Sequence, residues 1–332
     1  MIRSRMIARI TRHLLLFQIL LAIGAFFLFA ALLSEANIAL VIALSLGMVI
    51  MLRLGITANN FYLAWRFRSD TPQDYRIGWW RACRVFAVEF KASMITSSWT
   101  MPFYSFSKRV AAAPEGLPVL LVHGYGCNSG YWHSMSKALL QAHITHSAID
   151  MEPVIGSIDD YVPQIHEAVE HLCSETGHEK LVIVAHSMGG LAVRAYLRDH
   201  GSHRVAKVIT LGTPHHGTAL AHFGVGLNTK QMRWTATEQE GISSDWLRAL
   251  AARENRLVYH LFVSMFSHHD NIISPQTSSY LEGAENIAFH AIGHVALALD
   301  PVVQAHVIRE IRAASRQAVD MTPQNIKASQ IS

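Results

Sequence analysis

The sequence is poor in cysteine and in charge, and each shortage narrows the classes of protein to which it can belong. Its 332 residues include three cysteines, an odd number at wide spacing, which excludes a disulfide-stapled scaffold: Cys83, Cys127 and Cys173. Only 16% of the residues are charged, whereas 51% are hydrophobic and the mean hydropathy is +0.21. The chain is long enough for a full core and is more apolar than most soluble proteins.

Charged residues are missing altogether from residues 13–33, HLLLFQILLAIGAFFLFAALL. This stretch has about the 20 residues that a helix needs to cross a bilayer. A second apolar run, residues 38–52, follows after four residues and is short for a span. The first run is also longer than the apolar part of most signal peptides. We therefore expect a helical membrane hairpin over residues 1–55; a single anchor and a cleaved signal are the alternatives.

Basic residues flank the two runs, and the loop between them has none. Four arginines precede the first run and three follow the second, so the positive-inside rule places both flanks and the body in the cytoplasm: Arg3, Arg5, Arg9, Arg12, Arg53, Arg66 and Arg68. If the second run does not span, the body lies on the other side. Residues 1–112 hold 13 Lys and Arg against 4 Asp and Glu, and residues 113–332 hold 15 against 20. The excess of basic residues is next to the membrane, where it suits anionic lipid, and does not indicate a nucleic-acid partner.

Residues 56–116 are predicted to be an amphipathic juxtamembrane region that ends in a linker, AAAPEGLP. A stripe at helical spacing predicts a helix: Trp79, Cys83, Phe86, Phe90 and Met94. The stripe suits packing on the body and suits the membrane interface equally well. The aromatic residues Phe61, Tyr62 and Trp65 are typical of an interfacial belt.

Strand and helix patterns alternate from residue 117 onward. Strands are predicted at residues 118–125, 146–151, 181–185, 206–211, 261–266 and 287–292, and helices at 158–174, 188–198 and 301–316. Such alternation predicts an α/β domain, residues 117–318, with a mostly parallel sheet covered by helices on both faces. Residues 319–332 are predicted to be a flexible tail.

A serine stands at the junction of one predicted strand and helix, in LVIVAHSMGG, residues 181–190. This is the position of the nucleophile elbow in G-x-S-x-G, although Ala185 replaces the first glycine. The turn needs small residues two before and two after Ser187, and Ala185 and Gly189 are small. Ser187 is therefore the candidate nucleophile.

An acyl-transfer serine needs oxyanion donors, a base and an orienting acid. The amide of Met188, at the start of the predicted helix, is one expected donor. The other is expected in the loop HGYG, residues 123–126, after an early strand. In the chain order Ser, Asp, His, Asp270 follows one late strand and His294 the next, so we expect the triad Ser187, Asp270 and His294.

These motifs resemble the bacterial triacylglycerol lipases and esterases of the α/β-hydrolase superfamily, over residues 117–312. The similar segments are AHSMGG (185–190), GSID (156–159), LGTPHHGT (211–218) and DNIISP (270–275). The resemblance implies that an A-x-S-x-G elbow is a subtype and that no cofactor or metal is needed. Histidines 215, 216 and 222 could in principle bind a metal, but their spacing does not support a site. The two apolar runs are a departure from secreted lipases, and with this bacterial resemblance they imply an inner-membrane location.

The resemblance also implies roles for further residues. Tyr125 would give the second oxyanion amide, and residues 219–247 would form a short cap over an acyl pocket, the alternative being an ordinary connecting segment. The substrate-binding residues would be His123, Gly124, His186, His215 and His216, although His123 is also typical of a structural histidine that holds its loop. The expected function is a membrane-anchored serine hydrolase acting on lipid esters. An acyltransferase, a thioesterase and a non-catalytic membrane protein of hydrolase fold are the alternatives.

Overall fold

A seven-stranded sheet forms the centre of the body in the computed structural model, which describes residues 6–237 and 241–320. The strand order is β1-β3-β2-β4-β5-β8-β9; β1 is antiparallel to β3 and the other neighbours are parallel. The bounds are β1 Lys108–Arg109, β2 Val119–Val122, β3 His146–Ile149, β4 Leu181–His186, β5 Val205–Leu211, β8 Phe262–Ser267 and β9 Glu285–Phe289. A separate hairpin pairs β6 Trp234–Thr235 with β7 Ile242–Ser243.

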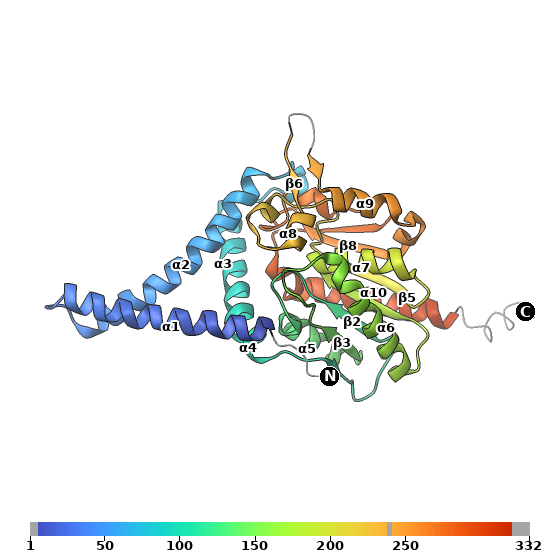
Figure 1. Cartoon of the computed structure of the whole chain (residues 1–332), viewed down its shortest axis with the longest axis horizontal. Helices are drawn as coiled ribbons and strands as arrows, with labels where there is room; N and C mark the ends of the chain where they lie inside the picture. Colours follow the sequence, from blue (N-terminus) through green and yellow to red (C-terminus); the bar gives the residue numbers. More distant parts are fainter. Residues whose placement is uncertain (1–5, 238–240, 321–332) are drawn as a thin grey trace, which may run out of the picture.

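Helices precede the sheet and connect its strands (Figure 1). The α-helices are α1 Met6–Leu32, α2 Ile38–Arg66, α3 Trp79–Ile95, α4 Met101–Phe103, α5 His133–Gln141, α6 Val162–Thr176, α7 Met188–His200, α8 Leu227–Gln231, α9 Asp245–Arg253 and α10 Pro301–Asp320. A π-helical turn, η2 Thr96–Thr100, links α3 to α4. The 3₁₀ segments are η1 Gln73–Tyr75, η3 Ser129–Trp132, η4 Ile158–Tyr161, η5 Ala219–Phe223, η6 Arg256–Leu261, η7 Gln276–Ser279 and η8 Val295–Ala298.

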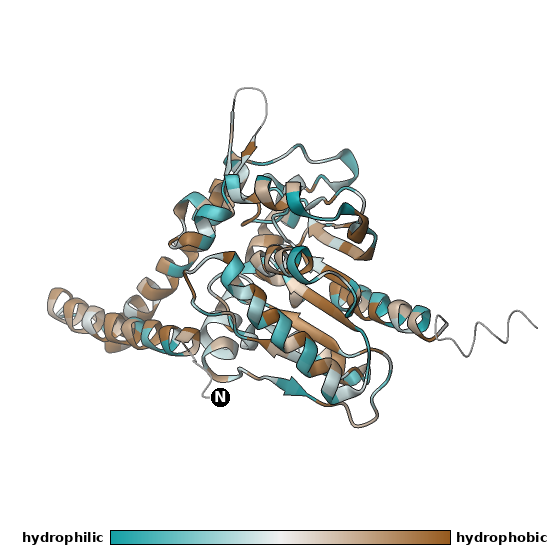
Figure 2. Ribbon diagram, turned by 45° about the vertical axis from the view of Figure 1, so that its right-hand side comes forward, coloured by the Kyte–Doolittle hydropathy of each residue, from teal (hydrophilic) through white to brown (hydrophobic). Residues whose placement is uncertain are grey.

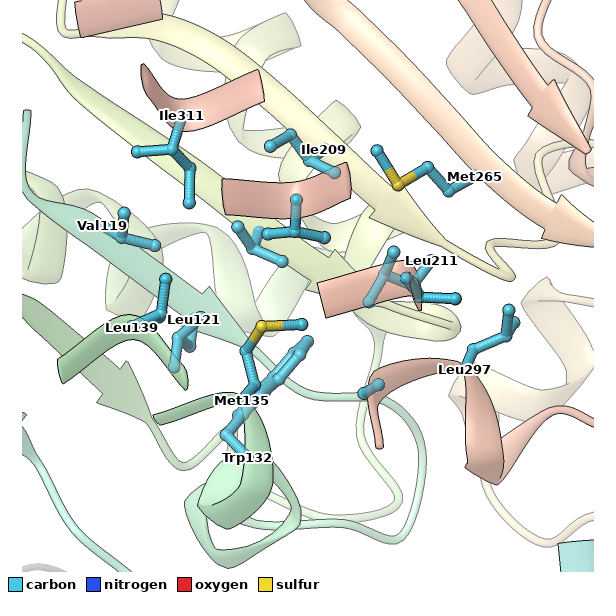
Figure 3. Close-up of a cluster of buried hydrophobic side chains, with 14 of the residues drawn as sticks. Val119, Leu121, Trp132, Met135, Leu139, Ile209, Leu211, Met265, Leu297 and Ile311 are labelled. Carbon is cyan, nitrogen blue, oxygen red and sulfur yellow. The ribbon is translucent and has the colours of Figure 1, made fainter. Parts of the chain in front are cut away.

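Both faces of the sheet are buried. Successive side chains of a strand point to opposite faces, and each of the two sets packs into a hydrophobic cluster. In β2, Val119 and Leu121 pack into one cluster with residues of α5, η8 and α10, and Figure 3 shows their side chains converging with Trp132 and Met135. Leu120 and Val122 pack into a second cluster on α6 and α7. This is the two-sided helical cover that the alternating pattern predicts.

The strand predicted at residues 287–292 is wrong at both ends. Residues 285–289 pair with residues 263–267 of β8, and the ladder then stops. Ala291 has a φ of 60°, a left-handed conformation that an extended strand cannot contain. His290 therefore lies after the strand and not within it, and a short loop separates β9 from His294.

The two N-terminal helices are long and apolar enough to cross a membrane, at 27 and 29 residues. Only 6% and 11% of their most apolar windows are buried within the protein, so they are not core helices of the body. They form a hairpin that projects from the body, and much of its length is hydrophobic (Figures 1 and 2). Their length and exposure fit the apolar hairpin expected from the sequence.

The helix α2 continues beyond the predicted anchor boundary at residue 55 and ends at Arg66. Phe61, Tyr62 and Trp65 therefore lie on α2 itself, at the end nearest the body. Arg53, counted above as a flanking charge, also lies inside α2. Its guanidinium donates to Gln18 Oε1 of α1 at 2.7 Å and to Ser98 Oγ of η2 at 2.8 Å. This network joins the hairpin to the chain that follows it.

The helix α3 lies between the hairpin and the sheet, and it packs against both α2 and η8 (Figure 1). Its buried face consists of Val85, Glu89 and Ala92. The stripe predicted from the sequence lies beside that face: Phe86, Phe90 and Met94 are half-buried, and Trp79 remains 75% exposed. One side of α3 therefore packs on the body while its N-terminal tryptophan stays exposed.

Candidate active site

The predicted catalytic residues lie in loops that leave the carboxyl end of the sheet, where parallel α/β sheets carry their sites. Gly124 follows β2, Ser187 follows β4 and Gly212 follows β5. Asp270 comes three residues after β8, and His294 follows β9. Because these strands are neighbours in the order β2-β4-β5-β8-β9, residues 170 positions apart in sequence converge on one edge.

Ser187 occupies a sharp turn between β4 and α7. Its φ of 54° and ψ of −129° are strained for a residue with a side chain. Three hydrogen bonds hold its backbone there: its N–H donates to Leu211 O at 2.9 Å, and its carbonyl accepts Thr213 Oγ1 at 2.9 Å and the Gly190 N–H at 3.1 Å. This is the local geometry of a nucleophile elbow.

The close contacts of the elbow explain its glycines. A Cβ on Gly189 would lie 2.5 Å from His123 O and 2.6 Å from Val122 O, and both are backbone atoms that cannot move aside cheaply. Ala185 tolerates its methyl group inside β4, where it is fully buried and paired in register with Val122 and Thr210. The strict demand for glycine therefore falls on Gly189.

The loop after β2 approaches the elbow closely enough to form an oxyanion site. A Cβ on Gly124 would lie 2.8 Å from Ser187 Cβ, so only glycine fits there. Tyr125 follows it, and the Tyr125 side chain lines the same cavity as Ser187. Met188 is the first residue of α7, and an amide at that position has no acceptor within its own helix. Met188 is thus adjacent to Ser187 in the chain, and Tyr125 is close to it in space.

Asp270 and His294 form a buried pair. Asp270 Oδ2 and His294 Nδ1 are 2.8 Å apart, and the side chains are 2% and 6% exposed. The other carboxylate oxygen accepts the amides of Ile272 and Ile273, each at 2.8 Å. With Nδ1 turned to Asp270, Nε2 is the nitrogen left for a serine hydroxyl. In the described residues the Ser187 hydroxyl makes no hydrogen bond, and apo sites of this kind often tighten only when substrate binds.

A buried acid that the sequence reasoning missed lies beside His294. Glu89 of α3 is 1% exposed, and its two carboxylate oxygens accept the amides of Val295 and Ala296, each at 2.9 Å. A Cβ on Gly293 would lie 2.5 Å from the same carboxylate. The signal in the sequence is that Glu89 is the only acid between residues 75 and 114. Nothing local connects it to a histidine more than 200 positions away.

The electrostatics of His294 suit a base near neutral pH. Burial lowers the pKa of His294, but the nearby carboxylates of Asp270 and Glu89 outweigh burial and raise that pKa above its usual value. For Glu89 itself, burial raises the pKa and the two amide hydrogen bonds oppose the rise. The imidazolium that forms during proton transfer is therefore stabilised by two carboxylates.

His123 and His186, predicted to bind substrate, are engaged with the scaffold. His123 Nε2 accepts the Met151 amide at 3.0 Å, which leaves Nδ1 to donate to Gly124 O at 2.8 Å. Burial lowers the pKa of each of the two histidines, so both are neutral at pH 7. His186 Nε2 donates to the carbonyl of His294 at 3.1 Å. Both side chains thus hold the loops that carry the site.

His215 and His216, also predicted to line the cleft, lie outside the lining of the cavity above Ser187. His215 is buried beside Thr210 and Ser264, and the His216 ring is hydrogen-bonded to Tyr280 O at 3.1 Å. Their neighbours Pro214 and Thr218 line the cavity instead. The segment is at the site, as expected, but neither histidine is among the residues that line the cavity.

The cavity above Ser187 has a volume of about 230 Å³. Its walls come from the predicted cap, from the loop after Asp270 and from α2, together with Tyr125 and residues of the 214–218 segment. The region predicted to be a cap contains η5, α8 and the β6-β7 hairpin, and α9 begins at its end. Residues 238–240 of this region lie outside the described residues, and so do residues 321–332 of the predicted tail. Within residues 6–237 and 241–320 no group of three His, Cys, Asp or Glu side chains is arranged to hold a metal.

The end of α2 is tied to the loop that carries Asp270. Ser274 Oγ donates to Ala64 O of α2 at 2.9 Å. Gln276 connects the same two segments, because its Oε1 accepts the Ser69 amide at 3.2 Å and its Nε2 donates to Asp270 O at 3.0 Å. The chain preceding the sheet therefore contacts both loops of the acid–histidine pair, the first through α2 and the second through Glu89.

Comparison with known proteins supports this description of the fold. Residues 118–237 match the family model described as the alpha/beta hydrolase fold. A lipase of Bacillus licheniformis, 16% identical, superposes with a TM-score of 0.52 over 63% of this chain and 98% of the lipase chain. Lipase B of Aspergillus fumigatus, also 16% identical, gives a TM-score of 0.51 over 61% and 55%. The body of the chain has the α/β-hydrolase fold.

Sequence similarity to two lipases covers a limited part of the chain. Proteins from Pseudarthrobacter phenanthrenivorans and Burkholderia plantarii, both named triacylglycerol lipase, are 32% identical to this chain over 117 residues. The match covers 32% of this chain and about a third of each relative, 35% and 32%. The family match includes the Ser187 elbow and the loop of Tyr125, whereas Asp270 and His294 lie beyond it.

Proposed function

We propose that this chain is a serine hydrolase that cleaves carboxylic esters of lipids. The observation that carries the proposal is the meeting of a strained serine elbow with a buried histidine–aspartate pair at one edge of the sheet: Ser187, His294 and Asp270. The similarity to two proteins named triacylglycerol lipase favours ester substrates. The apolar lining of the cavity above Ser187 favours the same class.

In the proposed reaction, His294 Nε2 takes the proton of Ser187 as Oγ attacks the ester carbonyl. The C–O bond to the alcohol breaks, and His294 returns its proton to the leaving alkoxide. Water, deprotonated by His294, then attacks the acyl-serine and releases the fatty acid. The amides of Tyr125 and Met188 stabilise the oxyanion in both steps. Asp270 holds the imidazole in the required tautomer, and the chemistry calls for no cofactor.

We further propose that α1 and α2 insert in a membrane as a hairpin, with the body on the cytoplasmic side. The exposure of both helices supports this, because apolar surface of that extent is unfavourable in water. The polar network from Arg53 to Gln18 and Ser98 supports a hairpin retained in the mature protein, since α1 is bound to the rest of the chain through it.

A steady-state assay tests the proposed activity. The full-length protein in detergent should hydrolyse p-nitrophenyl butyrate, and Ser187→Ala should lower kcat by at least about 10⁴-fold. Ser129→Ala, which changes a buried serine of η3 outside the site, is the matched control and should retain most of the activity. Equal rates for wild type and Ser187→Ala would overturn the assignment.

A further inference from the structure

The cavity above Ser187 has one wall that the body does not supply. Asn59, Asn60 and Leu63 of α2 line it, together with residues of η5 in the cap, including Phe223. The helix α2 and η5 pack against each other, and Figure 1 shows the end of α2 beside the cap elements. The second helix of the apolar hairpin is thus part of the substrate cavity.

The height of this wall relative to a bilayer follows from the length of α2. About 20 helical residues cross the hydrocarbon core. Counted from Ile38, where α2 begins, a crossing ends near Thr57. Asn59 and Leu63 then lie at the interface on the side of the body. The exposed aromatic residues Tyr62 and Trp65 share this level, where such side chains are favoured.

The outer rim of the cavity is apolar and exposed. Phe223, which lines the cavity, is 64% exposed, and Val225 is 69% exposed. Tyr125 fixes this loop, because its hydroxyl donates to Val225 O at 2.8 Å. Ile155 and Leu227 extend the rim, joined by the hydrogen bond from Leu227 N to Ile155 O at 2.9 Å. An exposed apolar surface therefore continues from α2 onto the cap.

The size and chemistry of the cavity favour one occupant. The lining residues that the structure describes carry no charged side chain. Its volume of about 230 Å³ is below the roughly 300 to 1,000 Å³ of pockets that enclose a drug-sized ligand. A long acyl chain would therefore fill the cavity near the serine and continue past the rim, where the apolar surface and the bilayer can receive it.

We propose that this cavity binds the acyl chain of a membrane-resident glycerolipid ester, which enters laterally along α2 without passing through water. The inference rests on the hydrolase proposed above and specifies its substrate. In this proposal the hairpin anchors the body at the membrane, and its helix α2 also forms the cavity wall along which the acyl chain reaches Ser187.

The test uses full-length protein reconstituted in phosphatidylcholine vesicles. Leu63→Trp places an indole in the cavity, and Ala58→Trp places the same indole on an exposed position of α2 outside the lining. Two substrates are compared, dioleoylglycerol in the vesicles and p-nitrophenyl acetate in the water. Leu63→Trp should lower kcat/KM for dioleoylglycerol at least ten-fold more than for the acetate, and Ala58→Trp should leave the ratio unchanged.

The outcomes separate this inference from the proposed function. Equal losses on both substrates in Leu63→Trp, or no loss, would overturn the acyl wall while leaving the hydrolase intact. Wild-type hydrolysis of the acetate without any cleavage of dioleoylglycerol would overturn the membrane-lipid substrate. Failure of wild type on both substrates would instead contradict the hydrolase itself. Labelling of Ser187 by a small fluorophosphonate establishes that Leu63→Trp has folded.

Discussion

At the scale of single residues, two acidic residues that are far apart in the sequence, Glu89 and Asp270, act on His294. Asp270 bonds its ring, and Glu89 bonds the two amides that follow it. Glu89 is buried and is not among the described residues that line the cavity above Ser187. Its role is therefore that of a positioning residue, which also contributes negative charge.

The first prediction concerns the pH dependence of this pair. His294 must be neutral to accept a proton, so kcat/KM rises with pH through the pKa of His294. Since that pKa is raised, the acid limb of the profile should lie above the usual value of about 6.5. Glu89→Gln keeps the size of the side chain and one acceptor oxygen but removes the charge, so the acid limb should move to lower pH.

The control for this profile is Glu115→Gln, the same loss of charge at an exposed position in the linker. It should leave the acid limb where it is in wild type, because exposed charges are screened. An unchanged profile in Glu89→Gln would show that Glu89 has no electrostatic influence on the histidine. A uniform loss of kcat at every pH would indicate a purely structural role.

At the scale of elements, the elbow between β4 and α7 depends on the strand beside it. The sequence pattern identifies the elbow because its demands are local: a strand, a serine and small neighbours. The pattern does not reveal that Gly189 faces the carbonyls of Val122 and His123 at the end of β2, since that contact depends on how the sheet assembles. Glycine is therefore required at position 189 by its contact with the neighbouring strand β2.

A matched pair of variants tests this element. Gly189→Ala should abolish activity and destabilise the protein, because the added methyl meets two backbone oxygens at about 2.5 Å. Ala185→Gly restores the commoner motif and should retain activity, with a loss of stability of about 1 kcal/mol from the added backbone freedom. Thermal unfolding and ester hydrolysis measure both. Full activity in Gly189→Ala would contradict the packing described here.

Other elements were only partly predictable from the sequence. The triad positions follow from strand ends and chain order, and the structure brings Asp270 and His294 together as expected. His123, His186, His215 and His216 are hydrogen-bonded to backbone or scaffold groups. For His123 this agrees with the loop-holding alternative given by the sequence. The sequence could not decide the direction of these rings, because a histidine in a motif carries no sign of which way its ring points. Here hydrogen bonds to backbone and scaffold groups, formed only after folding, settle those directions.

At the scale of the whole molecule, the apolar N-terminal hairpin and the body share one site. The sequence separates them clearly by composition, and it places the boundary at residue 55. In the structure, α2 extends to the cavity and α3 contacts the loop that follows His294. Contacts between segments some 200 residues apart leave no local pattern, so neither could be predicted from the sequence.

The proposed topology gives a prediction at this scale. Expressed in a bacterium, the full chain with a C-terminal alkaline phosphatase should be inactive as a phosphatase, since that enzyme folds only where disulfides form. A C-terminal green fluorescent protein should fluoresce. A third fusion after Asn37, in the loop between α1 and α2, should give an active phosphatase. Phosphatase activity from the C-terminal fusion would contradict the cytoplasmic assignment.

The most direct measurement of the central claim is to locate a covalent adduct of a fluorophosphonate by mass spectrometry of the full-length protein. The account predicts one adduct, on Ser187, formed rapidly in wild type. Labelling should be slowed at least about 10³-fold in His294→Ala, because the base that activates the serine is missing. Absence of labelling in wild type, or an adduct on another residue that persists in Ser187→Ala, would contradict it.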